Sequence, residues 1–260
     1  MEADGEFMTC SAFHLADSHK RLVNFRDLGG LPTEGGGITN SGLLYRSDAP
    51  YPGDEDPADV AEWPPRTVID LRSAHELREA HPWSVHSTVK SVPLMSAAAV
   101  VTADSEDSGD TATRLCSIYT EILGTVQDRL AGMIVVAAHA EGPLQIHCAA
   151  GKDRTGISVA MLLLSAGVTR EAVIEDYMNT APNMGRLIDR LEALGRRSRT
   201  EPRPAPAVLA APRDLIEMVI DNFVGRSGGF DSWAERNGVR LSDLELWRKK
   251  FVADTARAVG

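Results

Sequence analysis

The amino-acid sequence predicts an α/β fold with a central, mostly parallel sheet of four to five strands, flanked by helices and followed by C-terminal helices. Two patterns predict it. Short runs rich in Val, Ile and Leu have the length of buried strands, and longer stretches repeat apolar residues every three or four positions, as amphipathic helices do. Because the two kinds of segment alternate along the chain, the strands are expected to lie parallel with helices against them.

Four segments have the length and composition of strands, namely residues 43–46, 67–71, 89–94 and 144–147. Each is bounded by Gly, Pro or charged residues, which are depleted in strands. Their nearly continuous apolar character indicates a sheet that is covered on both faces. Upstream, residues 24–30 and 34–37 contain runs of glycine and are expected to form loops and tight turns.

A helical pattern occurs between the third and fourth strands and again after the fourth. Apolar residues at three- and four-residue spacings predict helices over residues 115–137. A strongly apolar helix is predicted over residues 155–166, with Gly167 as the left-handed residue after its last turn. Thr169 is placed to cap the next helix, which is expected to continue to about Met178.

The C-terminal part is expected to be helical again over residues 215–223 and after a break at Gly228-Gly229. Residues 242–245 read SDLE, which fits the S-x-x-E capping box of a last helix. Between these regions, residues 196–213 contain four prolines and five arginines. Because proline interrupts helices, this segment is expected to be a lid or a linker.

Length and composition limit what the protein can be. We expect a polar tail over residues 1–20 and a single domain over residues 21–260. The formal net charge of -10 argues against a nucleic-acid partner, so an anionic ligand would need a local cationic site. No apolar run approaches the roughly 20 residues of a membrane-spanning helix, and the acidic N-terminus is unlike a secretory signal. A cytoplasmic location without stable membrane insertion is therefore expected.

The most specific segment of the sequence is residues 144–158, LQIHCAAGKDRTGIS, which combines an apolar strand, a tight turn from Cys148 and a helix from about Arg154. The other two cysteines, Cys10 and Cys116, are too scattered to form a disulfide framework with it. Successive main-chain N–H groups in such a turn can face one point, and the helix N-terminus adds unpaired donors. The segment is therefore expected to bind an anion such as phosphate.

Cys148 lies where this anion would bind. Thiols at helix N-termini or beside cations ionise well below their usual pKa of about 8.5, so Cys148 is expected to be a thiolate at neutral pH. A thiolate under bound phosphate can attack phosphorus in line and give a phosphocysteine, which water then hydrolyses. Arg154 can grip two phosphoryl oxygens with its planar fork. Thr155 is expected to donate its hydroxyl to the Cys148 sulfur, and His147 to orient the loop.

Five residues match the H-C-x-x-G-x-x-R-[ST] signature of the cysteine-based protein tyrosine phosphatase superfamily: His147, Cys148, Gly151, Arg154 and Thr155. The longer string HCAAGKDRTG, with NFRDLGG, YRSD, VIDLRS and DYM elsewhere, resembles the bacterial broad-specificity group typified by mycobacterial protein tyrosine phosphatase B. The resemblance covers most of the chain from about Leu22. It implies a helix-flanked sheet, no metal or other cofactor, and activity on phosphotyrosine, phosphoserine or phosphothreonine, and phosphoinositides. It also implies a helical lid, here over residues 180–213.

The general acid that protonates the leaving group is the one site residue for which the sequence offers alternatives. Family members carry an Asp after a V-x-L-x-P-like stretch, but this chain has Met95 and Ser96 there. Asp153 inside the loop is the preferred candidate, and Asp104 or Asp107 is the alternative. The phosphate-binding residues are expected to be Ala149, Ala150, Gly151, Lys152, Asp153, Arg154 and Thr155.

Several charged residues are expected to support this loop. Lys152 adds a second cation at its mouth, a placement that suits phosphatases of multiply phosphorylated inositol headgroups, although surface solvation explains it equally well. Arg26 and Asp27 are placed to buttress the loop through an ion pair, and a turn role is the alternative for both. For Asp70 and Arg72, at the end of the second strand, the same two roles are expected, support of the loop through an ion pair or a role in a turn.

Other functions fit the residues less well. A nucleotide-binding P-loop fails because Ile146 stands where its first Gly should be and Asp153 follows the Lys. His139, His147 and Cys148 lack a fourth zinc ligand at a recognisable spacing, so no metal is expected. Two alternatives to the phosphatase above remain, a phosphatase of nucleotide or sugar phosphates and a phosphate-binding module with little turnover.

Overall fold

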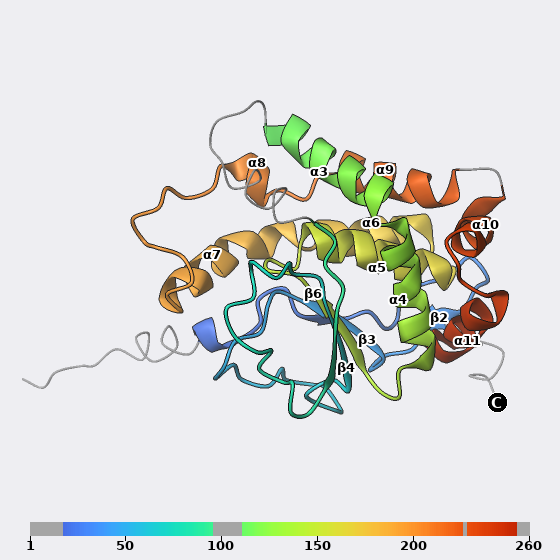
Figure 1. Cartoon of the computed structure of the whole chain (residues 1–260), viewed down its shortest axis with the longest axis horizontal. Coiled ribbons are helices and arrows are strands. Elements are labelled where there is room, and N and C mark those ends of the chain that lie inside the picture. Colours follow the sequence, from blue (N-terminus) through green and yellow to red (C-terminus); the bar gives the residue numbers. More distant parts are fainter. Residues whose placement is uncertain (1–17, 96–110, 226–227, 254–260) are drawn as a thin grey trace, which may run out of the picture.

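The computed structural model describes residues 18–95, 111–225 and 228–253, and it has the α/β architecture that the sequence predicts (Figure 1). Within these residues one sheet has five strands in the order β1-β3-β6-β4-β5. Four strands run parallel: β3 (Leu44–Ser47), β6 (Leu144–His147), β4 (Thr67–Asp70) and β5 (Thr88–Ser91). Strand β1 (Arg26–Asp27) pairs antiparallel with β3 at one edge, and β2 (Ile38–Thr39) forms a separate antiparallel pair with β7 (Val252–Ala253).

Helices occupy most of the rest of the described chain. In order they are η1 (Ser18–Lys20), α3 (Thr111–Thr125), α4 (Gln127–His139), α5 (Asp153–Ser165), α6 (Arg170–Met178), η2 (Ala181–Asn183), α7 (Met184–Ala193), α8 (Pro206–Leu209), α9 (Arg213–Val224), α10 (Gly229–Arg236) and α11 (Leu241–Phe251). Over the described residues, no helix combines the length and the apolar character that crossing a bilayer requires.

Helix α5 is the centre of the core. It packs against α4, α6 and α9 and follows directly on the central strand β6, and nearly all of its side chains are buried. This explains why its sequence is apolar all round rather than on one face. Gly167 has a φ of +79° just beyond this helix, which confirms the predicted left-handed residue.

An aromatic cluster covers the other face of β3. Tyr45 has its ring 5.3 Å from Phe25 and 6.3 Å from Trp63, and Trp63 packs edge-on against Trp83 at 4.8 Å. These partners come from loops, so the sheet is covered on this face by aromatic side chains from loops rather than by a helix. The predicted two-sided burial is confirmed for β3, β4 and β6, in which every residue is buried. It is wrong for β5, which lies at the edge of the sheet and is mostly exposed.

Two predicted details are wrong, and a third is confirmed in position only. Strand β5 ends at Ser91 rather than at residue 94, because Pro93 has no N–H to donate to a ladder. Helix α11 begins at Leu241, before the expected capping box, and no side chain caps it. Thr169 holds the capping position of α6, but its side chain makes no capping bond.

Candidate active site

The loop from Cys148 to Lys152 joins the end of β6 to the start of α5. Strand β6 lies between β3 and β4, and His147 at its end is in register with Ser47 of β3 and Asp70 of β4. The loop therefore lies at the carboxyl edge of a parallel sheet, where open α/β sheets usually bind their ligands. Gly151 has a φ of +68°, and a Cβ there would lie 2.4 Å from the Ser47 carbonyl oxygen.

Cys148 lies inside this turn and is 2% exposed. Its sulfur accepts the Gly151 N–H at 3.2 Å, so a main-chain donor of the loop points at the expected nucleophile. The start of α5 at Asp153 adds the positive end of a helix dipole beside it. The expected bond from Thr155 to the sulfur is not formed. The buried Thr155 hydroxyl has no hydrogen-bond partner among the described residues.

The guanidinium of Arg154 is held end-on by Glu76. Nη1 donates to Oε2 and Nη2 to Oε1, both at 2.7 Å, and Nη1 also donates to the Leu71 carbonyl at 3.4 Å. Of the five N–H donors of an arginine, this leaves Nε–H and one Nη2–H, which lie on the same edge of the fork. Burial lowers the pKa of Arg154, but the hydrogen bonds and charges of Glu76 and Cys148 outweigh it and the pKa is raised. Arg154 thus keeps a free, charged edge for an oxyanion.

Glu76 is held in turn by Ser73, whose N–H and hydroxyl donate to it at 2.8 and 3.0 Å. Burial raises the pKa of Glu76, but its bonds to Arg154 and Ser73 more than compensate, so the pKa is lowered and the carboxylate stays charged. Sequence reasoning missed Glu76, because nothing in the spacing of residues 73–78 indicates that this loop reaches α5.

Asp153 projects toward α3 and α6. Its Oδ1 accepts the hydroxyl of Tyr119 at 3.0 Å and the Lys152 ammonium at 2.9 Å, and the Tyr119 hydroxyl also contacts that of Tyr177 at 2.7 Å. No described group bonds to Oδ2, and the Asp153 side chain is 27% exposed. The other two candidate acids, Asp104 and Asp107, lie outside the described residues.

A buried ion network supports the loop from below. Arg46 of β3 donates to the Gly151 carbonyl at 2.8 Å and pairs with the Asp176 carboxylate, which also pairs with Arg26 at 2.6 Å. Arg26 therefore reaches the loop through two intermediaries rather than directly. Asp27 takes no part, since it accepts the N–H groups of two glycines in the turn beside β1.

Arg46 and Asp176 were not singled out from the sequence as functional residues. The signal that could have found them is a charged residue inside a buried strand or helix, because such charges are almost always paired.

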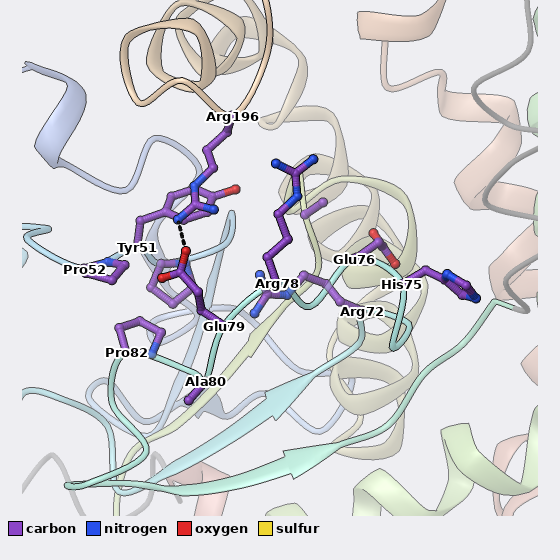
Figure 2. Close-up of a pocket in the computed structure, with 12 residues that line it drawn as sticks. Tyr51, Pro52, Arg72, His75, Glu76, Arg78, Glu79, Ala80, Pro82 and Arg196 are labelled. Atoms are coloured by element: carbon purple, nitrogen blue, oxygen red, sulfur yellow. Dashed lines mark hydrogen bonds and ion pairs between the residues drawn. The ribbon is translucent and has the colours of Figure 1, made fainter.

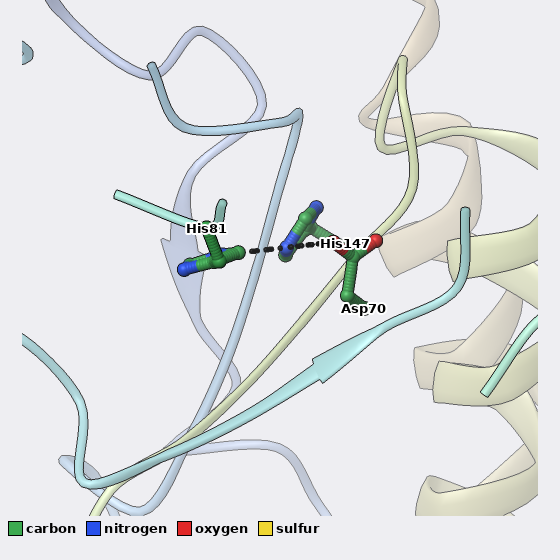
Figure 3. A group of neighbouring side chains, drawn as sticks. All are labelled: Asp70, His81 and His147. Carbon is green, nitrogen blue, oxygen red and sulfur yellow. Dashed lines mark hydrogen bonds and ion pairs between the residues drawn. The ribbon is translucent and has the colours of Figure 1, made fainter. Parts of the chain in front are cut away.

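Three buried residues cluster behind the loop, His147, His81 and Asp70 (Figure 3). The Nε2 atoms of the two histidines are 3.1 Å apart, and His147 Nε2 is 3.8 Å from Asp70 Oδ2. These are the ligand atoms of the described chain that lie close enough together to hold a metal. Asp70 however accepts three bonds from the Arg72 guanidinium at 2.7 to 3.2 Å, so the group is already satisfied by hydrogen bonds. The sequence spacing of His81 gave no sign of this contact.

A cleft of about 380 Å³ opens beside the loop at Ala149 (Figure 2). Glu76, the partner of Arg154, forms part of its wall. Three arginines line the cleft, namely Arg72, Arg78 and Arg196, together with the carboxylates of Glu76 and Glu79. Arg72 and Arg196 have acidic partners, whereas the Arg78 guanidinium extends into the cleft in Figure 2 without a bond to the other residues drawn there.

The segment over residues 180–213 lies against the loop. The Lys152 ammonium donates to the Ala210 carbonyl at 3.0 Å, and Ala150 packs with Leu209 against a small apolar cluster that includes Met184 and Leu187. Helix α7 in this segment is anchored by Arg190, which is 1% exposed and pairs with Asp48 at 3.1 Å and Asp54 at 2.7 Å. The expected lid thus begins with a helix that is fixed to the body of the protein.

The comparisons with known proteins agree with this geometry. A family model described as the tyrosine phosphatase family matches residues 18–253. The chain is 30% identical over 111 residues to the triple specificity protein phosphatase PtpB of Mycobacterium tuberculosis, which covers 37% of this chain and 40% of that protein. It is 29% identical over 168 residues to a predicted tyrosine-protein phosphatase of Cupriavidus necator, covering 61% and 60% of the two chains. The chain thus matches well under two thirds of the length of these relatives.

Proposed function

Since the chain belongs to the tyrosine phosphatase family, we propose that it hydrolyses phosphomonoesters of the tyrosine and dual-specificity type through a phosphocysteine intermediate. Cys148 is the nucleophile in this proposal and Arg154 the residue that binds the phosphoryl oxygens. The observation that carries it is the geometry of the loop. A main-chain N–H donates to the Cys148 sulfur. Glu76 accepts hydrogen bonds from both terminal nitrogens of Arg154 and thereby fixes the orientation of the guanidinium, whose remaining N–H groups lie on one edge.

The reaction has two steps. The Cys148 thiolate attacks phosphorus and forms the S–P bond while the P–O bond to the leaving group breaks, and an acid protonates the departing oxygen. Water then attacks phosphorus, the S–P bond breaks, and inorganic phosphate and the thiolate are released. Arg154 and the main-chain N–H groups stabilise the charge on the equatorial oxygens in both transition states. The unpartnered Thr155 hydroxyl is available to stabilise the thiolate when it leaves.

Asp153 is the proposed general acid. Both of its bonds end on Oδ1, so Oδ2 is the atom that would carry the proton.

The proposed substrates are phosphotyrosine, phosphoserine or phosphothreonine, and phosphoinositides. The name of the Mycobacterium tuberculosis relative, a triple specificity phosphatase, supports a broad range, and the arginine-lined cleft beside Ala149 supports a substrate with further negative charge. The volume of this cleft is within the range of small-molecule sites, about 300 to 1,000 Å³. Nucleotide and sugar phosphates are therefore the alternative substrates, and they are included in the experiment below.

The deciding experiment is hydrolysis of para-nitrophenyl phosphate with a chelator present, followed by a panel of phosphopeptides, phosphoinositides, nucleotides and sugar phosphates. The wild type should turn over, and mass spectrometry after rapid acid quenching should find one phosphoryl group on the peptide that contains Cys148. Cys148→Ser should bind vanadate or substrate without turnover, and Arg154→Lys should lose most activity. Absence of turnover by the wild type would instead favour a phosphate-binding module.

A further inference from the structure

A line of hydrogen bonds runs from the loop after β6 to the loop that contains His81 and Trp83, and Figure 3 shows its middle part, the contact of His81 with His147. The Trp83 N–H donates to His81 Nδ1 at 3.2 Å, His81 Nε2 contacts His147 Nε2 at 3.1 Å, and His147 Nδ1 contacts the Cys148 carbonyl oxygen at 3.1 Å. We call this line the His81–His147 relay. Its last member is the carbonyl of the expected nucleophile.

The two main-chain ends determine where each proton lies. The Trp83 N–H can only donate, so His81 Nδ1 is unprotonated and neutral His81 carries its proton on Nε2. The Cys148 carbonyl can only accept, so His147 carries its proton on Nδ1 and its Nε2 is an acceptor. The protonated Nε2 of His81 therefore faces the unprotonated Nε2 of His147, and the 3.1 Å contact is a hydrogen bond from His81 to His147.

We propose that His81 is a positioning residue that holds His147 in its Nδ1–H tautomer and thereby fixes the main chain at Cys148. This inference rests on the proposed function of Cys148 as the nucleophile. The role of His81 is to donate a single hydrogen bond, because it lies across His147 from the reacting atoms and makes no contact with the Cys148 sulfur or Arg154 among the described hydrogen bonds.

The surroundings favour the neutral relay. The charged groups that face the two rings are Asp70, Arg72 and Arg154. Burial is the main reason that the pKa of His147 is lowered to about 4 and that of His81 to about 3, and the arginines act in the same direction. Asp70 would favour a charged His147, but its oxygens are already bonded to Arg72. A protonated ring has no acceptor nitrogen, so protonation of His147 would remove its bond from His81, and protonation of His81 would remove its bond from the Trp83 N–H.

The far end of the relay packs against aromatic side chains. Trp83 packs edge-on against Trp63 at 4.8 Å, and Trp63 belongs to the aromatic cluster on Tyr45 of β3. His81 itself is 8% exposed. The position of the Cys148 carbonyl therefore depends on side chains on the face of the sheet away from α5.

The first test needs no variant. The ¹⁵N shifts and proton couplings of the imidazole rings, measured on the full chain at pH 7, distinguish the two neutral tautomers from the charged form. We expect His147 as the Nδ1–H tautomer and His81 as the Nε2–H tautomer. Any other state of His147, or a spectrum that changes when a chelator removes a bound ion from these nitrogens, would overturn the proposal.

The second test compares His81→Gln with His81→Leu, using para-nitrophenyl phosphate. Glutamine can place an N–H donor near the position of Nε2, whereas leucine removes the donor and keeps the side chain apolar. We expect His81→Leu to lower kcat by about fivefold to tenfold, the effect of one lost hydrogen bond, with little change in KM. His81→Gln should keep kcat within about twofold of wild type and keep the Nδ1–H tautomer of His147.

His86→Leu is the matched control, because it makes the same substitution at an exposed position five residues away and should leave kcat unchanged. Equal loss in His81→Gln and His81→Leu, or wild-type kcat in His81→Leu, would contradict the inference. If His81→Leu does not fold, the spectrum of the wild type and the kcat of His81→Gln still decide it. If the wild type hydrolyses no phosphomonoester, the proposed function fails, while the tautomer measurement still tests the relay.

Discussion

Arg154 is shared between two partners, one inside the protein and one that the substrate would supply. Its end-on pair with Glu76 uses the donors that point away from the loop and leaves an adjacent pair on the free edge. A buried arginine that was held less firmly would have to be oriented when substrate binds, and this would cost part of the binding energy. Glu76 is therefore expected to affect the rate rather than the fold alone.

Glu76→Gln tests this role. The glutamine amide would present N–H groups to the Nη donors, so one of the two bonds is lost and the fork of Arg154 is free to turn. We expect kcat for para-nitrophenyl phosphate to fall about tenfold to a hundredfold. Glu62→Gln is the control, since Glu62 pairs with Arg66 on the exposed surface. An unchanged kcat in Glu76→Gln would remove the positioning role.

Asp153→Asn tests the general acid. Asparagine keeps the size of the side chain but cannot supply a proton, so the loss should grow with the pKa of the leaving group, up to about 10²- to 10⁴-fold for poor leaving groups. The measurement is kcat/KM over a series of aryl phosphates, with Asp104→Asn and Asp107→Asn in parallel. Equal losses of Asp153→Asn along the series would exclude the acid role, and a steep slope in either other variant would transfer it there.

At the scale of elements, the strand β6, the loop and helix α5 follow directly from the sequence. Their composition changes abruptly from apolar to small and charged and back to apolar within 15 residues, so local pattern suffices. The partners of the loop could not be predicted in this way. Glu76, Arg46 and His81 lie 66 to 105 residues away in the chain from the residues that they contact at the site, and only the tertiary fold brings them together.

The loop passes so close to β3 that position 151 requires a residue without a side chain. Gly151→Ala would place a methyl group 2.4 Å from the Ser47 carbonyl oxygen in a left-handed conformation, so the loop must move. We expect a loss of about 1 to 3 kcal/mol in the free energy of unfolding and of most activity. Gly132→Ala in α4 meets no atom within 4 Å and should instead stabilise by about 0.5 to 1 kcal/mol. Urea denaturation of both variants tests the contrast, and equal effects would contradict it.

Helix α7 depends on one buried arginine. Arg190→Met leaves the carboxylates of Asp48 and Asp54 buried without their shared partner, and we expect the free energy of unfolding to fall by about 3 to 5 kcal/mol. Arg186→Met, on the exposed face of the same helix, should change it by less than about 0.5 kcal/mol. A small effect of Arg190→Met would mean that α7 is held by its apolar contacts alone.

At the scale of the whole molecule, charge is distributed unevenly. The chain carries a formal net charge of -10, yet arginines gather around the loop and the cleft. The expectation from composition that an anion site must be local stays a prediction, and composition alone could not place such a site. The arrangement favours substrates that reach the cleft itself and repels polyanions elsewhere.

The stability of the protein should decrease on mild acidification. The unfolded chain protonates His81 and His147 near pH 6.5, whereas burial keeps both neutral in the folded protein down to pKa values of about 3 and about 4. The unfolded state thus gains protons first, and stability is lost as the pH falls below 6.5. Asp48, whose pKa burial raises to about 6, and Asp54, whose pKa burial also raises, act in the opposite direction.

The expected net loss between pH 7.5 and pH 5 is on the order of 2 kcal/mol in the free energy of unfolding. Urea denaturation at the two pH values measures it, and His81→Gln should reduce the difference because it removes one of the two histidines. Stability that stays level or increases at pH 5 would contradict this reading of the buried pair.

The segment after α7 has a consequence for the electric field at the entrance. Gly195 has a φ of +64°, and residues 198–208 beyond it are nearly all exposed, while Arg190 keeps the preceding helix in place. If this strap swung outward, Arg196 would leave its stacking position 4.8 Å from the Tyr51 ring, and Lys152 would lose the Ala210 carbonyl. One such movement would therefore take a guanidinium away from the rim of the cleft and leave the Lys152 ammonium, still paired with Asp153, as the cation beside the loop.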